Sequence, residues 1–157
     1  MTPAAPVAES RIYQFASQSG GDTIAVGSKL ARLLRPPQLI ILSGDLGTGK
    51  TTLVKGIAQA LDAADPDEVT SPTFTLLHEY HGARDGHAVK LFHLDVYRLE
   101  GERQLDTLGL DELLTPEALV LVEWGEKFKS IKKKSTGEIA ITSAGGDARR
   151  ITVTLKE

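Results

Sequence analysis

The sequence predicts an α/β fold with a mainly parallel central sheet, antiparallel edge strands and flanking helices. Two apolar runs, QLIILSG at 38–44 and ALVLVEW at 118–124, have the length and composition of strands buried inside a parallel sheet. Strand-like and helix-like segments alternate in the first half of the chain. Two hairpin patterns, within 74–95 and 137–156, follow later, and hairpins add antiparallel strands to a sheet.

The first half of the chain alternates strands with helices. Residues 11–17 alternate apolar and polar side chains, which predicts a strand. A helix follows, with Asp22 as its expected N-cap and the proline pair at 36–37 as its end. After the strand at 38–44, apolar side chains at helical spacing predict a second helix over 50–61.

The second half is expected to begin with a polar, proline-containing loop that has room to move. A hairpin, one or two short helices, a buried strand and a closing hairpin are expected after it. In order, these five segments are 62–73, 74–95, 101–114, 118–124 and 137–156. Gly and Asp residues favour turns at 83–86 and 145–147.

Length and composition indicate one intracellular domain. The chain has 157 residues, of which 41% are hydrophobic, so we expect a flexible tail at 1–10 and a single domain at 11–157. The absence of cysteine excludes a disulfide scaffold and is compatible with the cytoplasm. The first ten residues lack a secretory signal, and no apolar stretch reaches the length of a membrane span. With a net charge of −3, neither DNA nor a membrane is an expected partner.

A phosphate-binding motif lies between the strand at 38–44 and the helix at 50–61. Residues 44–51, GDLGTGKT, match G-x-x-x-x-G-K-[ST], in which glycines let backbone N–H groups converge on a phosphate. Lys50, whose side chain we expect to be exposed, adds a cation for the β- and γ-phosphates, and Thr51 offers a hydroxyl to Mg²⁺. An ordinary glycine-rich turn is the simpler alternative. The residues expected to bind ATP or ADP here are Asp45, Leu46, Gly47, Thr48, Gly49, Lys50, Thr51 and Thr52.

An acidic residue at the end of a neighbouring strand is needed to help hold Mg²⁺. Two residues satisfy this requirement, because LFHLD ends at Asp95 and VLVEW contains Glu123. Either carboxylate has a simpler interpretation as a helix cap. The pattern alone does not choose between them.

Four segments together resemble the TsaE family, the ATPases of bacterial tRNA threonylcarbamoyladenosine biosynthesis. They are GDLGTGKTTL, VTSPTFTL, FHLDVYRL and LVEWGE, and the resemblance covers about residues 40 to 126. It implies a small P-loop NTPase-like fold that binds ATP and Mg²⁺ and hydrolyses ATP slowly alone. It also implies action with TsaB and TsaD, and with tRNA indirectly through that complex.

The resemblance also implies roles for individual residues. Lys50 would contact phosphate, and Thr51 and Glu123 would hold the metal; Lys50, Asp95 and Glu123 would form the catalytic set. Thr73 matches a mobile segment near the γ-phosphate, and Trp124 neighbours the nucleotide. The adenine pocket would draw on the amino-terminal region near Thr23 and on the closing hairpin, where Arg149 lies.

Other functions and sites have to be weighed against this interpretation. A small-molecule P-loop kinase also suits the length and motif, although no arginine-rich lid is evident, and a nucleotide-gated binding module is a third possibility. The histidines at 78, 81, 87 and 93 are expected to be core or solvated residues, with His93 a possible site neighbour of Asp95. The lysines at 127–134 are expected to form a solvated face, with RNA contact as the alternative.

Overall fold

The computed structural model describes residues 10–45 and 47–156. The strands in these ranges are β1 (Ser10–Ser17), β2 (Gln38–Ser43), β3 (Leu77–Arg84), β4 (His87–Asp95), β5 (Ala118–Glu123), β6 (Gly137–Gly145) and β7 (Ala148–Lys156). The helices are α1 (Gly20–Leu33), α2 (Lys50–Ala60), α3 (Glu102–Thr107), α4 (Leu110–Leu113) and α5 (Lys129–Lys134), with 3-10 turns η1 (Pro66–Glu68) and η2 (Gly125–Lys127). Strand β1 begins at Ser10, which the sequence had assigned to the tail; the rest of that tail lies outside the described residues.

The strands form one seven-stranded sheet in the order β1-β7-β6-β2-β5-β4-β3. Its four central strands are parallel, because β2 pairs in parallel with both β5 and β6, and β5 pairs in parallel with β4. Antiparallel partners flank them, β3 on β4 at one edge and β7 with β1 at the other. The predicted mainly parallel centre with antiparallel edges is therefore confirmed.

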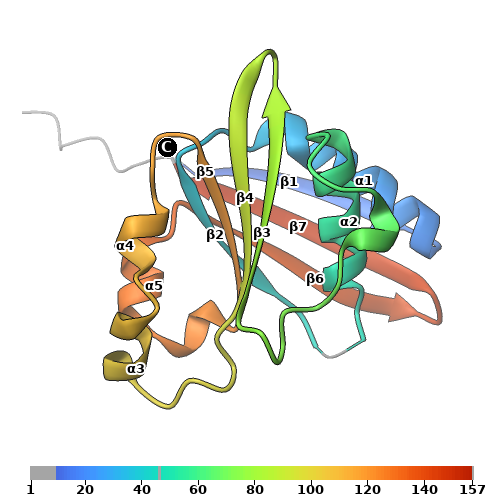
Figure 1. Ribbon diagram of the computed structural model, residues 1–157. Coiled ribbons are helices and arrows are strands. Elements are labelled where there is room, and N and C mark those ends of the chain that lie inside the picture. Colours follow the sequence, from blue (N-terminus) through green and yellow to red (C-terminus); the bar gives the residue numbers. More distant parts are fainter. Residues whose placement is uncertain (1–9, 46, 157) are drawn as a thin grey trace, which may run out of the picture.

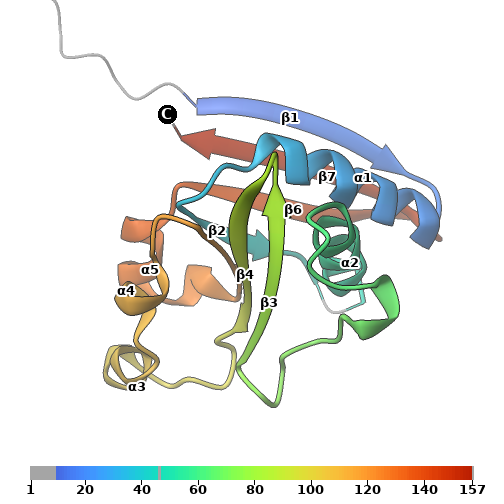
Figure 2. The same cartoon turned by 45° about the horizontal axis from the view of Figure 1, so that its top comes forward.

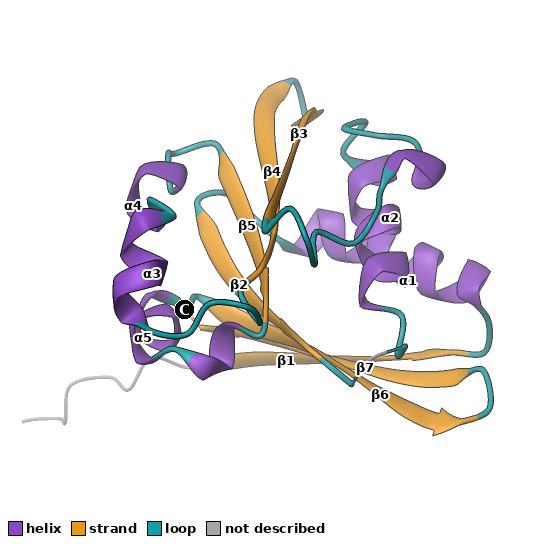
Figure 3. Cartoon of the chain, turned by 60° about the horizontal axis from the view of Figure 1, so that its bottom comes forward, coloured by secondary structure: helices purple, strands orange, loops and turns teal. Residues whose placement is uncertain are grey.

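Helices cover both faces of this sheet (Figures 1 and 2). Helices α1 and α2 pack on one face, where Leu30, Ile57 and Leu121 belong to the same apolar cluster. Helices α3, α4 and α5 cover the other face over a second cluster that includes Val120 and Ile131 (Figure 3). Alternate residues of β5 enter opposite clusters, as the two-residue period of a strand requires.

Helices α1 and α2 touch through a pair of glycines. A Cβ atom at Gly27 would collide with the carbonyl oxygen of Leu53, and one at Gly56 would collide with that of Ile24. Both positions therefore exclude any side chain, which brings the two helix backbones into direct contact.

Several element boundaries differ from the sequence-based expectation. The N-cap of α1 is Ser19, whose hydroxyl accepts a hydrogen bond from the Asp22 N–H, so the predicted cap lies inside the first turn. Strand β5 ends at Glu123, because Trp124 adopts the left-handed conformation with φ 64°. Helix α5, in the lysine-rich segment, was not predicted. Among the described residues, no helix is long and apolar enough to cross a membrane.

Candidate functional site

The glycine loop curls between the end of β2 and the start of α2. Gly47 and Gly49 have φ angles of 80° and 103°, a left-handed backbone that favours glycine, and Gly49 is the N-cap of α2. Thr48 closes the loop internally, since its hydroxyl donates to the Asp45 carbonyl oxygen at 2.7 Å. The loop thus reaches the first turn of α2, where unpaired N–H groups are available to an anion.

Arg149 of β7 joins this loop to the closing hairpin. Its Nε donates to the Thr48 carbonyl oxygen at 2.9 Å, and its Nη1 donates to the Gly146 carbonyl oxygen at 2.7 Å. The closing hairpin and the glycine loop are therefore tied together by one side chain. The family resemblance pointed to Arg149 as part of an adenine pocket, and its contact with Thr48, 101 residues away in the chain, was not foreseen.

Lys50, the motif lysine, is buried, and the expected exposure of its side chain is wrong. It is 8% exposed, and its Nζ donates to the Gly44 carbonyl oxygen at 2.7 Å. Nζ also lies 3.4 Å from Glu123 Oε1, which makes an ion pair between α2 and β5. The lysine folds back over its own loop, where the carboxylate compensates its charge.

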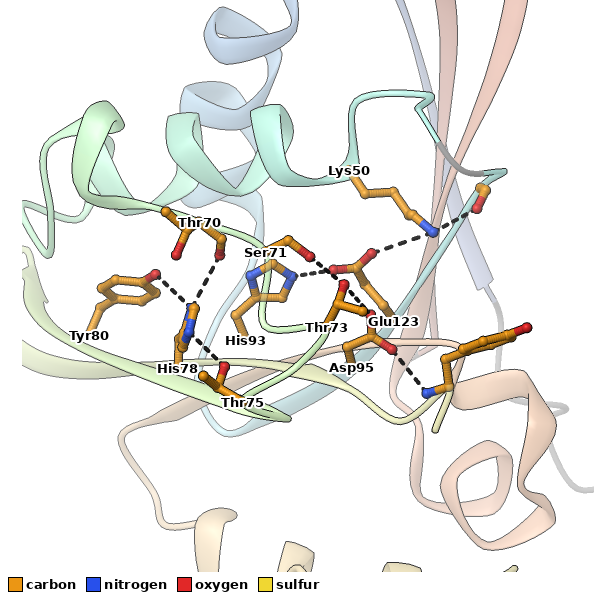
Figure 4. A network of polar contacts seen from close by, with 12 residues as sticks. Lys50, Thr70, Ser71, Thr73, Thr75, His78, Tyr80, His93, Asp95 and Glu123 are labelled. Carbon is orange, nitrogen blue, oxygen red and sulfur yellow. Dashed lines mark hydrogen bonds and ion pairs between the residues drawn. The ribbon is translucent and has the colours of Figure 1, made fainter. Parts of the chain in front are cut away.

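Glu123 contacts two other buried polar side chains, Lys50 and His93. Its Oε2 lies 2.6 Å from Nε2 of His93, a fully buried residue of β4 (Figure 4). Burial raises the pKa of Glu123, but its contacts with His93 and Lys50 outweigh that effect and hold the pKa below its usual value. Glu123 is therefore a carboxylate at neutral pH.

Asp95 connects the end of β4 to the segment 71–75. Its Oδ2 accepts a hydrogen bond from the Thr73 hydroxyl at 3.2 Å, and its Oδ1 accepts one from the Tyr97 N–H at 2.9 Å. Asp95 is opposite Glu123 in the parallel register of β4 and β5. The two candidate acids thus lie side by side at the carboxyl edge of the sheet, where ligands of open α/β sheets bind.

These side chains surround a cavity of about 610 Å³. It is lined by Gly47, Gly49, Lys50, Thr51, Thr52, Ser71, Thr73, Asp95, Tyr97, Glu123 and Trp124. The structure therefore brings together most residues of the predicted site, from α2, the 71–75 segment, β4 and β5. Ser71 and Tyr97 were not among the predicted binding residues, although both lie in the segments that carry the family resemblance.

Not every predicted residue lines the cavity. Asp45 and Thr48 support the loop instead, and Leu46 lies outside the described residues. Thr23 is buried behind the loop, where its hydroxyl lies 2.6 Å from the Ser17 hydroxyl and 3.2 Å from the Ser19 carbonyl oxygen. A contact between Thr23 and a nucleotide stays a prediction.

Trp124 is one of the residues that line the cavity. Its ring is tilted on the Tyr97 ring at 4.9 Å between centroids, and Lys50 Nζ lies 5.1 Å from the indole centroid. The left-handed backbone at Trp124 turns the chain sharply after Glu123. The turn keeps the indole beside the cavity.

The histidines form no metal site. His78 contacts Thr70 and Thr75 of the preceding segment, and His81 pairs with Glu79. Across the described ranges, no group of three or more His, Asp or Glu side chains is arranged to hold a metal ion. His93, considered a possible site neighbour, is in direct contact with Glu123.

The basic segment is partly engaged within the chain. Lys127 donates to the Tyr97 carbonyl oxygen at 2.6 Å, and Lys134 pairs with Asp111 at 2.6 Å. Lys127 therefore holds the turn that follows Asp95. The lysines of this segment are exposed, as expected, and contact with RNA stays the untested alternative.

The site as a whole offers backbone N–H groups, one cation and two carboxylates around a single cavity. Such a set can bind a polyanion on the loop and place oxygen ligands beside it. Within this set, the buried Lys50–Glu123 pair brings one positive and one negative charge together.

Comparison with known proteins shows which family this chain resembles. The family model described as threonylcarbamoyl adenosine biosynthesis protein TsaE matches residues 17–151. A tRNA threonylcarbamoyladenosine biosynthesis protein TsaE from Bacillus subtilis is 40% identical over 85% of this chain and 79% of its own. The protein of the same name from Treponema pallidum is 37% identical over 87% of this chain and 96% of its own length.

A solved structure extends the likeness to the fold. The crystal structure of Bacillus subtilis YdiB superposes with a TM-score of 0.67 and 31% sequence identity. The match covers 95% of this chain and 88% of that chain. From the cavity and its glycine loop, the matched family model and these relatives, we conclude that the chain belongs to the TsaE family.

Proposed function

We propose that this chain is a Mg²⁺-dependent P-loop ATPase that binds ATP and ADP and acts in tRNA threonylcarbamoyladenosine biosynthesis. Its turnover is slow when alone, and it works with TsaB and TsaD, reaching tRNA through that assembly. The lack of cysteine agrees with a cytoplasmic protein. The relatives' names support the pathway, and the cavity supports the nucleotide.

The convergence of Lys50, Thr51 and Glu123 beside the curled glycine loop carries this proposal. Each group has a counterpart in the chemistry of a bound nucleoside triphosphate. The loop and the first turn of α2 present N–H groups to phosphate oxygens, and Lys50 exchanges Glu123 for the β- and γ-phosphates. Lys50 Nζ lies 3.4 Å from Glu123 and 2.7 Å from the Gly44 carbonyl oxygen, so in this exchange it gives up both contacts.

The residues present fit a magnesium ion. Mg²⁺ takes oxygen ligands and keeps several waters, so one or two protein oxygens are enough beside the phosphates. Thr51 and Glu123 both line the cavity, so a hydroxyl and a carboxylate are available there. A site with so few protein ligands needs no cluster of three His, Asp or Glu side chains, and the described part of the chain has none. When bound, Mg²⁺ neutralises the charge that develops on the transferred phosphoryl group.

Asp95 is given a different role from Glu123. Both of its oxygens accept hydrogen bonds, one from the Thr73 hydroxyl and one from the Tyr97 N–H. Through Thr73 it controls the 71–75 segment, which lines the same cavity through Ser71 and Thr73. Asp95 thus orients this segment and the water that attacks the γ-phosphate.

The cavity favours slow hydrolysis over phosphoryl transfer to a small acceptor. Kinases stabilise the transferred group with arginines, whereas no arginine is among the described residues that line this cavity. A small-molecule kinase is therefore the second candidate. Adding the TsaB–TsaD pair should raise phosphate release, and adding nucleosides or shikimate-like alcohols should not.

A binding experiment tests the nucleotide assignment directly. Titration calorimetry with ATP and ADP, with and without Mg²⁺, should give saturable binding that Mg²⁺ strengthens. Release of labelled phosphate should be slow for the chain alone. No binding of either nucleotide by the folded chain would overturn the proposal.

A further inference from the structure

His93 occupies an unusual place for a histidine. It is fully buried in β4, on the sheet face that packs against α1 and α2, two residues before Asp95. Its Nδ1 has no hydrogen-bond partner among the described residues, and only Nε2 makes a contact, at 2.6 Å from Glu123. Burying an unpaired ring nitrogen costs free energy that leucine at this position would not incur. The contact with Glu123 therefore accounts for the histidine.

The direction of this hydrogen bond follows from the chemistry of its partners. A carboxylate only accepts hydrogen bonds, so the proton lies on Nε2 of His93. In the neutral ring, Nδ1 then carries a lone pair. The partner of Nε2 is oxygen Oε2 of Glu123, whereas oxygen Oε1 lies toward Lys50.

We propose that His93 is a positioning residue, whose Nε2–H holds Oε2 of Glu123 so that Oε1 stays directed at the phosphate loop. The proposal rests on the proposed function, because it assigns Glu123 to the magnesium shell. When Lys50 leaves Glu123 for a phosphate, one contact of the carboxylate is lost. The contact with His93 remains and fixes the side chain, so a single oxygen is presented to the cavity.

A magnesium site depends on such support. The ion demands near-ideal octahedral geometry, and loss of a group that orients a ligand typically costs about 10–100-fold in metal affinity or activity. Without His93, the Glu123 carboxylate is free to rotate away from the position that the ion requires. His93 does not line the cavity itself, and its hydrogen bond to the lining goes to Glu123, so we expect its effect to pass through Glu123.

Two variants separate positioning from packing. His93→Leu removes the hydrogen-bond donor but still fills the core position with a side chain, whereas His93→Gln keeps an N–H donor near the position of Nε2. We expect His93→Leu to lower turnover about 10–100-fold and to raise the Mg²⁺ concentration needed for half-saturation with ATP. Affinity for ATP without Mg²⁺ should stay within about twofold, because the phosphate loop is unchanged. His93→Gln should restore much of the loss.

Leu121 provides a matched control. It lies opposite His93 in the register of β5, and is equally buried. Leu121→Val should lower stability with little change in Mg²⁺ dependence. Wild-type turnover and Mg²⁺ dependence in folded His93→Leu would overturn the proposal, as would an equal loss in Leu121→Val.

A measurement without nucleotide keeps the proposal testable if His93→Leu does not fold. The His93 Nε2–H proton should give an NMR resonance that exchanges slowly with water and moves in Glu123→Ala. A ring protonated on Nδ1 alone, or a resonance that ignores Glu123→Ala, would overturn the contact. Failure of the wild-type protein to bind Mg²⁺-ATP would instead overturn the proposed function. If wild type binds Mg²⁺-ATP and His93→Leu has the same affinity and Mg²⁺ dependence, only the role of His93 is overturned.

Discussion

Replacing Lys50 with alanine should have two separable effects, one on ATP and one on the free protein. The ammonium is 3.4 Å from Glu123 Oε1. At an effective dielectric constant of about 20, the attraction between these two charges is about 5 kcal/mol, and most of it is opposed by the desolvation of both groups. Because His93 still contacts Glu123, we expect the variant to lose about 1–3 kcal/mol of unfolding free energy.

The effect on ATP should be larger than the loss of one contact. A hydrogen bond to a charged group contributes about 1.5–3 kcal/mol, which corresponds to about 10–150-fold in the dissociation constant. In the variant, the negative charges of Glu123 and the phosphates are compensated by Mg²⁺ without the ammonium of Lys50, and this adds to the loss. We therefore expect Mg²⁺-ATP affinity to fall at least about tenfold.

Calorimetry for ATP and urea denaturation for stability measure the two effects. Lys29→Ala, which removes an exposed lysine of α1, controls for the change in net charge. Affinity within about twofold of wild type in folded Lys50→Ala would refute the phosphate-loop assignment. Unchanged stability would refute the buried ion pair as a stabilising contact.

Four further outcomes are expected. Glu123→Ala should weaken the Mg²⁺ dependence of nucleotide binding and abolish turnover, whereas Asp95→Ala should lower turnover and leave Mg²⁺-nucleotide binding nearly intact; Mg²⁺ titrations on both variants decide this, and the reverse pattern would exchange the two roles. Trp124 emission should shift and saturate on addition of Mg²⁺-ADP, and an indifferent spectrum under conditions of independently shown binding would place the indole outside the site. The matching TsaB–TsaD pair should accelerate phosphate release, and turnover of tens per second without partners would contradict assembly dependence. The folded state lowers the pKa of Glu123, so the stability that this carboxylate contributes is complete above the ordinary value of 4.5 and is lost as pH falls through the lowered pKa. The difference in unfolding free energy between wild type and Lys50→Ala should therefore shrink in acid. Denaturation at neutral and acidic pH measures this difference.

Features set by neighbours in the chain were predictable from the sequence. The strand, glycine loop and helix around Lys50 follow from local patterns, and so do the two hairpins and the acids at the ends of β4 and β5. The parallel centre was also expected, because the run 118–122 is apolar at every position and so on both faces of the sheet.

Features that depend on strand order were not predictable from local patterns. The burial of Lys50 requires β5 beside β2, which brings Glu123 over the loop. The contact between His93 and Glu123 requires β4 beside β5, although strand alternation already put His93 on the face of Asp95. Likewise, Arg149 reaches Thr48 only because β6 pairs with β2 and carries the closing hairpin to the loop.

The glycine contact between α1 and α2 restricts how this domain can respond to a nucleotide. Helix α2 begins at the glycine loop, and Gly27 and Gly56 bring its backbone directly against that of α1, so we expect the two helices to move together. The 71–75 segment is held mainly by side chains: Ser71, Phe74 and Thr75 are exposed, Pro72 is buried, and hydrogen bonds join Thr73 to Asp95 and Thr75 to His78. Information about the γ-phosphate is therefore expected to leave the site through this segment, and a partner that distinguishes ATP from ADP would detect it there.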